Sequence, residues 1–595
     1  MVKPIQNLSS LHFYTAFMAG GAAIIQQKSH LNKINVFPVP DADTGTNLAA
    51  TMVSIMENSR LSDSLKQTMD SIADSAILGA RGNSGIIFAQ FLHGIREQIT
   101  DADQINLTRF AQLLKNAVRY LYEAVVEPVK GTIITVVEDW IKSVEFHAPG
   151  VTDFTELLQK SYQSAVQSLK ETPQKLEVLA RYNVVDAGAQ GFVNFLEGIL
   201  AQIKKGKLIK HPPKTSFAEV DKTTHIFKKY DVIEYRYCTE ALLTQSGASV
   251  TELKNILKNY GNSAIVAGTQ QKFHFHIHTN QPGELFQEIR TLGTISQIKV
   301  DDMLRQYETA HARKFPIALV TDSAADLPRE LVERYQIQMI PFKISFGDNV
   351  YLDKLTLDPA RFYEMLEQSR DLPRSSQPDH KVIRNLYDHL TAHYDQIFTV
   401  HISSQLTGVY DSAVKISKNY SDKEIHVIDS RHLSASEGLI TLRVAQAIEA
   451  GDSFDTIVAA SENWVKNTRI LTDINSLKYM VKGGRVSPLT GLIAKLINLK
   501  PIVSMDQNGK GQAFGKSFSR SANMKKIIEI IKTEAADRKL WNYAVVHSNN
   551  RARADEYASK LEKILNLPPV YIVDISPVIG VHNGLGTVAV AYMFE

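Results

Sequence analysis

Residues 35–47 read Asn35-Val-Phe-Pro-Val-Pro-Asp41-Ala-Asp43-Thr44-Gly45-Thr46-Asn47, a polar loop inside a region that is otherwise patterned as helix. Apolar residues recur there at three- and four-residue spacing from about residue 9 to about residue 204, which predicts an all-α bundle over residues 1–205. Gly- and Asp-bearing loops interrupt the pattern at 38–47, 79–85 and 186–191. Loops at the end of a bundle are where such a fold presents a polar site.

The pattern changes beyond the bundle. A polar, Pro-containing stretch at 204–222 is typical of a linker. Strand patterns at 235–243 and 272–279 then alternate with helical ones at 250–259 and 284–292. They indicate a small α+β middle domain, which we place at residues 223–312.

The C-terminal half, residues 313–595, alternates short apolar strands with helical segments. The expected strands lie at 317–320, 397–400, 425–428, 544–546 and 570–573. This alternation predicts an α/β region with two lobes, 313–470 and 471–595, in which ligands bind at the carboxyl ends of strands. The expected fold class is therefore a multidomain chain with an all-α bundle, an α+β middle domain and an α/β C-terminal half.

Composition narrows the range of partners. The 595 residues carry 66 Lys and Arg against 63 Asp and Glu, a net charge of +3 without a long basic block, so we expect no nucleic-acid partner. The single cysteine, Cys238, cannot form an internal disulfide, which fits a reducing compartment. The apolar stretch 13–25 is too short to span a bilayer, so we expect a buried helix, no transmembrane segment and a cytoplasmic protein.

Asp41 and Asp43 place two carboxylates at positions i and i+2 of the first loop. Magnesium takes oxygen ligands, usually one or two protein carboxylates together with substrate phosphates. Thr44 and Thr46 add hydroxyls at the start of the next helix, whose backbone amides favour an anion. A second Gly-rich loop at 79–85 also precedes a helix, so the pair of loops predicts a polyphosphate site. For an isolated motif, an Asx turn that only caps the helix is the alternative.

Two further motifs join these loops: Gly131-Thr132-Ile133-Ile134-Thr135-Val136 and Asp186-Ala-Gly188-Ala-Gln190-Gly191. Together the four segments resemble the nucleotide-binding subunit of dihydroxyacetone kinases, and more closely its relative in bacterial fatty acid kinase, over about the first 200 residues. That family holds ADP or ATP in a helical barrel through magnesium ions. Carried over by position, the resemblance implies magnesium ligands at Asp41 and Asp43 and nucleotide contacts at Asn35, Thr44, Thr46, Asn47, Gly82, Asn83, Ser84 and Thr132.

This sequence departs from the dihydroxyacetone enzymes at two positions of the first loop. Asn35 stands where they have a third carboxylate, and in this respect it resembles the fatty acid branch. Ala42 occupies a position that is more often glycine, so a left-handed backbone there would be strained.

Histidines alternate along the predicted strand 272–279, where His274, His276 and His278 share one face. Cys238 lies in the other strand predicted for the middle domain. Imidazoles and a thiolate are the ligands that zinc prefers. A buried cysteine beside a polar strand face is the alternative.

The same two strands carry a second resemblance to fatty acid kinase. Residues 237–240, Tyr-Cys-Thr-Glu, and the His-x-His-Thr motif before Pro282-Gly283 match its central domain. The resemblance implies zinc on Cys238, His276 and His278, with His274 as an optional fourth ligand.

Hydroxyl-bearing residues cluster around strands of the C-terminal half. They are Thr321-Asp322-Ser323, Arg374-Ser375-Ser376-Gln377-Pro378 and the serines and threonine of residues 402–408. Hydroxyls near helix N-termini form a neutral cradle for a carboxylate, although each one alone is more often a helix cap. With residues 482–487, 498–501, 516–520 and 579–586, these segments resemble the DegV family of fatty-acid-binding proteins over nearly all of residues 313–595.

In that family a fatty acid lies in a closed apolar tunnel, and hydroxyls and a histidine hold its carboxyl group. The resemblance implies substrate-binding residues at Ser375, Ser376, Ser403, Ser404, His582 and Arg485. Arg520 resembles a family arginine that contacts the incoming phosphate, and Arg485 is a second candidate for that contact.

The resemblances together imply a fatty acid kinase fused into one chain. It would use ATP, magnesium and zinc and form an acyl phosphate for phospholipid synthesis, with Asp41, Asp43 and Arg520 as catalytic residues. An acyltransferase that consumes acyl phosphate is the implied partner, while a homodimer and transient membrane contact stay open. The alternatives are a kinase for a small polyol such as dihydroxyacetone, and a lipid carrier or sensor without catalysis.

Overall fold

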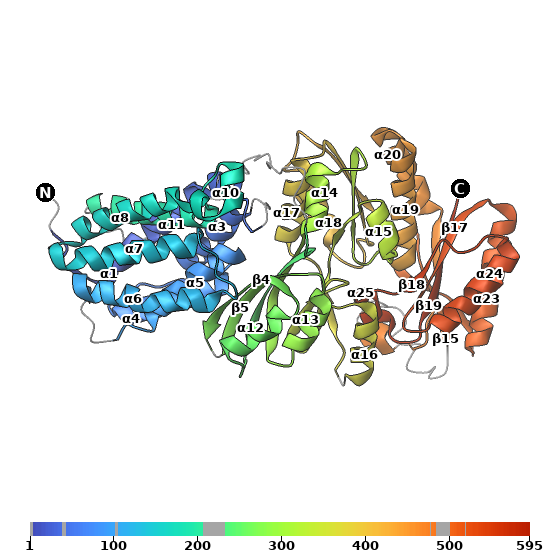
Figure 1. Cartoon of the computed structure of the whole chain (residues 1–595). Helices are drawn as coiled ribbons and strands as arrows, with labels where there is room; N and C mark the ends of the chain where they lie inside the picture. Colours follow the sequence, from blue (N-terminus) through green and yellow to red (C-terminus); the bar gives the residue numbers. More distant parts are fainter. Residues whose placement is uncertain are drawn as a thin grey trace. The chain divides into compact units, whose positions relative to one another are not determined.

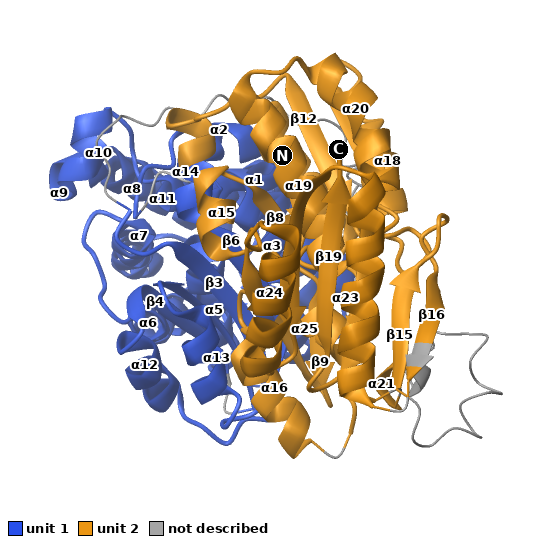
Figure 2. Ribbon diagram, turned by 90° about the vertical axis from the view of Figure 1, so that its right-hand side faces the viewer, with its two compact units in different colours: residues 1–307 blue, residues 308–595 orange. Residues whose placement is uncertain are grey.

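The computed structural model describes residues 4–38, 43–100, 105–205, 233–269, 271–369, 371–476, 478–482, 500–517 and 519–595, without the side chains of Thr269, Val481, Lys482 and Lys516. The chain forms two compact units, Met1–Tyr307 and Glu308–Glu595, coloured separately in Figure 2. Most of the predicted linker lies outside the described residues. So do Asp41 and Arg485 among the predicted site residues.

Helices build the first part of unit 1, as the sequence predicts (Figure 1). Their bounds are α1 Ser10–Gln26, α2 Lys28–Lys33, α3 Thr44–Asn58, α4 Leu65–Gly79, α5 Gly82–Arg96, α6 Leu107–Ala124, α7 Ile133–His147, α8 Phe154–Lys170, α9 Thr172–Lys175, α10 Glu177–Tyr182 and α11 Ala187–Lys205. The short strands β1 Asn7–Leu8 and β2 Ile105–Asn106 pair beside them.

The bundle is held by close packing between its first and last long helices. Phe195 of α11 lies between Phe17 of α1 and Phe88 of α5, with ring centroids 5.0 Å apart in both pairs. A methyl group on Gly198 would come within 2.9 Å of the Gly20 Cα atom, so these glycines let α1 and α11 approach closely. Helix α1 contains the apolar stretch 13–25, which confirms the predicted buried helix.

The second part of unit 1 is a four-stranded antiparallel sheet in the order β4-β5-β3-β6. Its elements are β3 Tyr237–Thr244, α12 Val250–Lys258, β4 Gly261–Thr269, β5 Lys272–Thr279, α13 Pro282–Ile289 and β6 Thr294–Asp302. Helix α14, Met303–His311, contains the boundary between the two units. One face is apolar and packs against α12 and α13 through Phe273, Phe275 and Ile277. The sequence did not reveal β4 and β6, because neither shows a clear apolar alternation.

The described residues of unit 2 form three sheets, and the two larger sheets differ in strand direction. The sheet β13-β12-β7-β8 is parallel, the sheet β16-β15-β14-β19-β17-β18 is antiparallel except for the β17–β18 pair, and the small sheet β10-β9-β11 is antiparallel. The strands are β7 Ile317–Asp322, β8 Gln338–Ile340, β9 Lys343–Phe346, β10 Asn349–Leu352, β11 Arg374–Ser376, β12 Gln396–His401, β13 Glu424–Asp429, β14 Thr468–Asp473, β15 Lys500–Met505, β16 Gly511–Ser517, β17 Leu540–His547, β18 Ile572–Asp574 and β19 Val588–Phe594. This confirms the α/β class predicted for the C-terminal half.

Helix α19, Ser434–Ala450, joins the two larger sheets because it contacts β7 and β12 of one and β14, β17 and β19 of the other. The other helices are α15 Arg329–Arg334, α16 Pro359–Gln368, α17 His380–Thr391, α18 Val409–Ser417, α20 Phe454–Lys466, α21 Lys478–Lys482, α23 Arg520–Asp537, α24 Arg551–Leu565 and α25 Pro577–Asn583. Within the described residues, none of the helices combines the length and apolar composition needed to cross a lipid bilayer.

Buried carboxylates fasten the loops that follow β7. Asp322 accepts the backbone amide of Ile402 at 3.0 Å, and Ser323 donates its hydroxyl to Asp353 at 2.6 Å. Asp326 accepts the amide of Ser576 at 2.9 Å. The sequence predicts that hydroxyls at this strand end face a ligand. The Ser323 hydroxyl instead forms its hydrogen bond with Asp353 in a neighbouring loop. Burial raises the pKa of Asp353 to about 7, although Lys354 and the Ser323 hydrogen bond oppose the shift.

We expect the pH dependence of unit 2 stability to change in an Asp353→Asn variant. Between about pH 4, where an unfolded Asp titrates, and pH 7, folded Asp353 keeps a proton that the unfolded chain releases. Rising pH therefore destabilises the natural protein across this window by at most about 1.4 kcal/mol per pH unit, and the asparagine variant lacks this loss. Urea denaturation at several pH values tests this, with exposed Asp348→Asn as the control. Parallel profiles for the natural protein and Asp353→Asn would contradict it.

Candidate nucleotide, metal and acyl sites

The four N-terminal motifs meet at one end of the bundle. A methyl group on Gly82 would come within 2.4 Å of Asn47 Nδ2, and one on Gly188 within 2.4 Å of Ser84 Oγ, so the loops before α3, α5 and α11 are in direct contact. Asp186 ties α7 to α11, because its carboxylate accepts the amides of Ala189 and Ile133. Burial raises the pKa of Asp186 to about 6.

Asp43 begins α3 and is only partly exposed. Its carboxylate accepts a hydrogen bond from the Asn47 side chain, and its Oδ2 lies 3.9 Å from Lys299 Nζ. Burial raises the pKa of Asp43, while Lys299 and Asn47 pull it down. Thr46 is exposed and hydrogen bonds to Asn32, which fixes the first turn of the helix. These groups offer oxygen ligands for a divalent cation beside a helix N-terminus.

Some of the other predicted nucleotide-binding residues already form hydrogen bonds with other groups of the protein. Thr132 donates its hydroxyl to the Val129 carbonyl at 2.8 Å, and the amide of Gly82 donates to Glu240 at 2.7 Å. The first amide of α5 thus donates to a carboxylate of the middle sheet, where the sequence predicts a phosphate. Asn83 Oδ1 is buried and has no hydrogen-bond partner in the described part of the chain, so it is available to a ligand.

One face of the middle sheet is polar and lies against the bundle. His274, His276 and His278 of β5 are each at most 3% exposed, and they alternate with the apolar residues of the other face. Glu240 of β3 is fully buried beside them. The contact with the bundle is direct: His274 hydrogen bonds to the Ile77 carbonyl and to Arg81. Burial lowers the pKa of His274 to about 4 and of His278 to about 3, which keeps both imidazoles neutral.

Cys238, His276 and His278 bring their ligand atoms within 4.8 Å of one another, and all three are buried. His276 Nε2 has no hydrogen-bond partner among the described residues, whereas its Nδ1 lies 3.2 Å from Glu240 Oε1. A buried thiol and two buried imidazoles, one with an unused nitrogen, are a fitting donor set for zinc. His274 lies outside this group because it contacts Ile77 and Arg81 instead.

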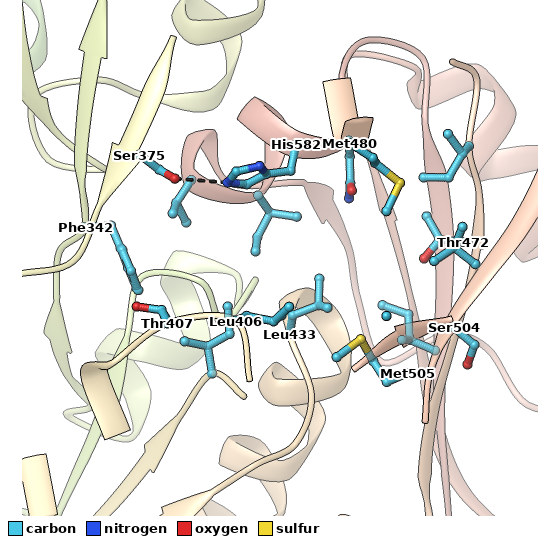
Figure 3. A pocket seen from close by; sticks show the side chains of 18 of the residues that line it. Phe342, Ser375, Leu406, Thr407, Leu433, Thr472, Met480, Ser504, Met505 and His582 are labelled. Carbon is cyan, nitrogen blue, oxygen red and sulfur yellow. Dashed lines mark hydrogen bonds between the residues drawn. The ribbon is translucent and has the colours of Figure 1, made fainter. Parts of the chain in front are cut away.

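Unit 2 contains a mostly apolar cavity with about 840 Å³ of empty space, the solvent at its mouth included. It is lined by Phe342, Ser375, Ser376, Gln377, Ile402, Leu406, Thr407, Leu433, Ile470, Thr472, Ile474, Met480, Val503, Ser504, Met505, Gly511, Val578, Ile579, His582 and Asn583. Ser375 Oγ and His582 Nε2 lie 3.0 Å apart at one side, opposite Met505 (Figure 3). A polar pair on an apolar wall suits a ligand with one polar end and a long apolar tail.

Three other predicted site residues do not line the cavity. Ser403 and Ser404 are not among the cavity residues, because their hydroxyls donate to the Gly509 carbonyl and to Asp429. Their loop lines the cavity through Leu406 and Thr407 instead. Arg520 also lies outside the lining: it donates to the Gly586 carbonyl at 2.6 Å and to buried Asp473 at 3.2 Å.

Sequence reasoning missed Glu240, Lys299 and Asp301. Glu240 follows Cys238 by two residues in one strand, so strand alternation alone would have placed it on the same face. Lys299 and Asp301 lie opposite Glu240 and Cys238 on β6, a strand that the sequence pattern did not reveal. Lys299 Nζ lies 2.6 Å from Asp301 Oδ2.

Comparison with known families divides the chain into three matched regions. Residues 38–201 match the DAK2 domain, residues 234–310 match the FakA-like middle domain of fatty acid kinases, and residues 316–595 match the DegV family. This is the architecture of a fatty acid kinase type of protein joined to a DegV region.

Individual relatives cover different shares of the chain. A DegV domain-containing protein of Clostridium acetobutylicum is 31% identical over 46% of this chain and 97% of its own length. The protein YloV of Bacillus subtilis is 32% identical over 51% of this chain and 57% of its own. An uncharacterized protein of Staphylococcus epidermidis is 28% identical over 62% and 69%.

Solved structures match the C-terminal half. DegV of Bacillus subtilis, described as a fatty acid binding protein, is 29% identical and covers 47% of this chain and all of its own, with a TM-score of 0.44. A fatty acid binding DegV family protein of Streptococcus agalactiae is 25% identical over 47% of this chain and 99% of its own, with a TM-score of 0.45.

We expect Ser375→Ala to weaken binding of an anionic ligand with an apolar tail. The variant removes one hydroxyl donor, which contributes about 0.5–1.5 kcal/mol, so the dissociation constant should rise about two- to tenfold. Displacement of a fluorescent fatty acid analogue measures the effect. Ser404→Ala is the matched control and should keep the natural affinity, because its hydroxyl is bonded to Asp429. A larger loss in the control than in Ser375→Ala would contradict this assignment.

Proposed function

Because the chain belongs to the DegV family and carries a DAK2 domain and a FakA-like middle domain before its DegV region, we propose that it is a fatty acid kinase. Unit 1 binds ATP, and unit 2 binds the fatty acid. The observation that carries the proposal is the Ser375–His582 pair on the wall of an apolar cavity, in a chain that also gathers the nucleotide motifs around Asp43.

The reaction is phosphoryl transfer to a carboxylate. A carboxylate oxygen of the fatty acid attacks the γ-phosphorus, the bond from that phosphorus to the β,γ-bridging oxygen breaks, and ADP leaves with the electron pair. The carboxylate is already ionised at neutral pH, so the step needs no general base. The protein contributes chiefly by positioning the reactants and stabilising charge.

Side chains of unit 1 support the nucleotide end of this reaction. Asp43, together with Asp41 outside the described residues, would hold magnesium, which neutralises phosphate charge when bound. Asn47 orients the Asp43 carboxylate, and Gly82, which precedes Asn83 and Ser84 in the first turn of α5, lies against Asn47. We assign Cys238, His276 and His278 to a zinc ion, on the basis of their grouping and the unused nitrogen of His276.

Unit 2 supports the acyl end. The Ser375 hydroxyl and the His582 imidazole offer hydrogen bonds to a carboxylate, and the apolar walls accept the chain. Arg520 is held by Asp473 and the Gly586 carbonyl, and we assign it to charge stabilisation near the transferred phosphate. Joining both units in one chain raises the effective concentration of each for the other. The product is an acyl phosphate, which an acyltransferase would consume.

The proposal predicts loss of acyl phosphate formation in Asp43→Asn. Removing one charge from the cation site should lower the rate at least about 100-fold, in line with loss of a group that stabilises transition-state charge. Trapping with hydroxylamine, with ATP and a long-chain fatty acid supplied, measures the product as acyl hydroxamate. The exposed Asp63→Asn is the matched control.

Two results would contradict the kinase proposal. A co-purified fatty acid without ATP consumption or hydroxamate would identify a lipid carrier or sensor. Phosphorylation of dihydroxyacetone without any acyl hydroxamate would identify a polyol kinase.

The zinc assignment predicts the metal content of purified protein. We expect about one equivalent of zinc in the natural protein and near none in Cys238→Ser or His276→Ala, because three protein ligands are the fewest usual for a bound zinc. Mass spectrometry of the elements measures this. His274→Gln is the control and should retain zinc, because His274 lies outside the ligand group. Equal zinc in Cys238→Ser and the natural protein would refute the site.

A further inference from the structure

Glu240 lies between the metal cluster and the nucleotide loops of unit 1. Its side chain is fully buried. Its Oε1 accepts the backbone amide of Gly82 at 2.7 Å and lies 3.2 Å from His276 Nδ1. Its Oε2 has no hydrogen-bond partner among the described residues. One carboxylate oxygen therefore joins a candidate zinc ligand to the first residue of α5.

The contacts continue from Gly82 to the cation site. Gly82 has a φ of 59°, which favours glycine, and the space where a side chain would lie is filled by Asn47. Asn47 in turn hydrogen bonds to Asp43. His276, Glu240, Gly82, Asn47 and Asp43 thus form an unbroken series of contacts within one compact unit.

Lys299 provides a second connection across the same sheet face. It lies opposite Glu240 in the β3–β6 register, and its Nζ is 3.9 Å from Asp43 Oδ2. Lys299 also binds Asp301, which lies opposite Cys238. Lys299, Asp301 and Asp43 are partly exposed, whereas Glu240 is fully buried. Placing ionisable groups where water is partly or fully excluded is costly unless they are paired, so mutual contacts hold this face together.

We propose that Glu240 is a positioning residue that couples metal binding at Cys238, His276 and His278 to nucleotide binding at the loops of Asp43 and Gly82. The proposal rests on the proposed function, from which it takes both ligands. Cys238, His276 and His278 would hold the metal ion. With the metal bound, the His276 imidazole would keep one orientation, it would orient the Glu240 carboxylate, and the carboxylate would fix the Gly82 amide against Asn47. Because coupling between two sites is reciprocal, zinc and nucleotide tighten each other by the same factor.

The opposite effect follows if Glu240 only occupies a phosphate position. A carboxylate at a helix N-terminus uses the same amides and dipole that attract a phosphate. Glu240 would then compete with the nucleotide, and removal of its charge would tighten nucleotide binding. The sign of the change in affinity therefore separates a positioning role from competition.

Calorimetric titration of the full chain with ADP, at fixed magnesium, tests the coupling with zinc present and after its removal. A competing chromophoric chelator measures zinc affinity with and without ADP. We expect ADP affinity to fall at least about fivefold without zinc, and zinc affinity to fall by the same factor without ADP. Circular dichroism checks that zinc removal leaves the secondary structure in place.

Variants of Glu240 test whether this residue couples zinc affinity to ADP affinity. In Glu240→Ala both ligands should bind but the coupling factor should fall to about one, because the link between His276 and Gly82 is gone. Glu240→Gln keeps an acceptor for the Gly82 amide and should retain part of the coupling factor. If the alanine variant does not fold, the result for Glu240→Gln tests the positioning role. Exposed Glu284→Ala, on the helix over the opposite sheet face, should keep the natural factor.

The outcomes separate this inference from the proposed function. If the natural protein binds ADP and zinc independently, or if Glu240→Gln keeps the full factor or binds ADP more tightly, the positioning role is wrong while the two sites stand. If the natural protein binds neither ADP nor zinc, the proposed function fails and the coupling fails with it.

Discussion

Burial of charge on one face of the middle sheet is the constraint on which the architecture of unit 1 depends. Glu240 is fully buried, and burial alone would raise its pKa, yet Lys299 and the His276 hydrogen bond lower it, so the carboxylate stays ionised. An ionised buried group needs hydrogen-bond partners. Those of Glu240 are His276 of the same sheet and the Gly82 amide of the bundle. The sheet and the bundle therefore share one polar boundary, and Ile265 and Ala267 of β4 join the apolar core of the bundle beside it.

In unit 2 none of the described buried carboxylates lines the cavity. Carboxylates such as Asp322 and Asp353 serve loop structure behind the cavity, where hydroxyls and amides satisfy them. The cavity itself exposes hydroxyl, amide and imidazole groups among apolar side chains and no acidic one among the described residues. A cavity without fixed negative charge can accept a carboxylate without electrostatic repulsion, which suits an acidic lipid.

Under the proposed function, the two units would divide the requirements of phosphoryl transfer to a fatty acid. Unit 1 concentrates carboxylates and helix N-termini, which suit a cation and phosphates, whereas unit 2 encloses a mostly apolar cavity. These environments are incompatible within one small core, because one must be polar and the other apolar. A chain that carries both as separate units resolves the conflict, and the chemistry itself demands little beyond positioning.

The sequence by itself determined the class of each region and the local motifs. Helical spacing identified the bundle and alternation placed the three histidines on one face, because these features depend on neighbours along the chain. The family resemblance singled out Ser375 and His582, and both line the cavity. The tertiary structure alone decided which groups meet. Glu240 joins Gly82 and Lys299 approaches Asp43 across 158 and 256 residues, and Ser403 turns to Gly509 and away from the cavity. Such pairings arise from packing between distant segments, and no local pattern encodes them.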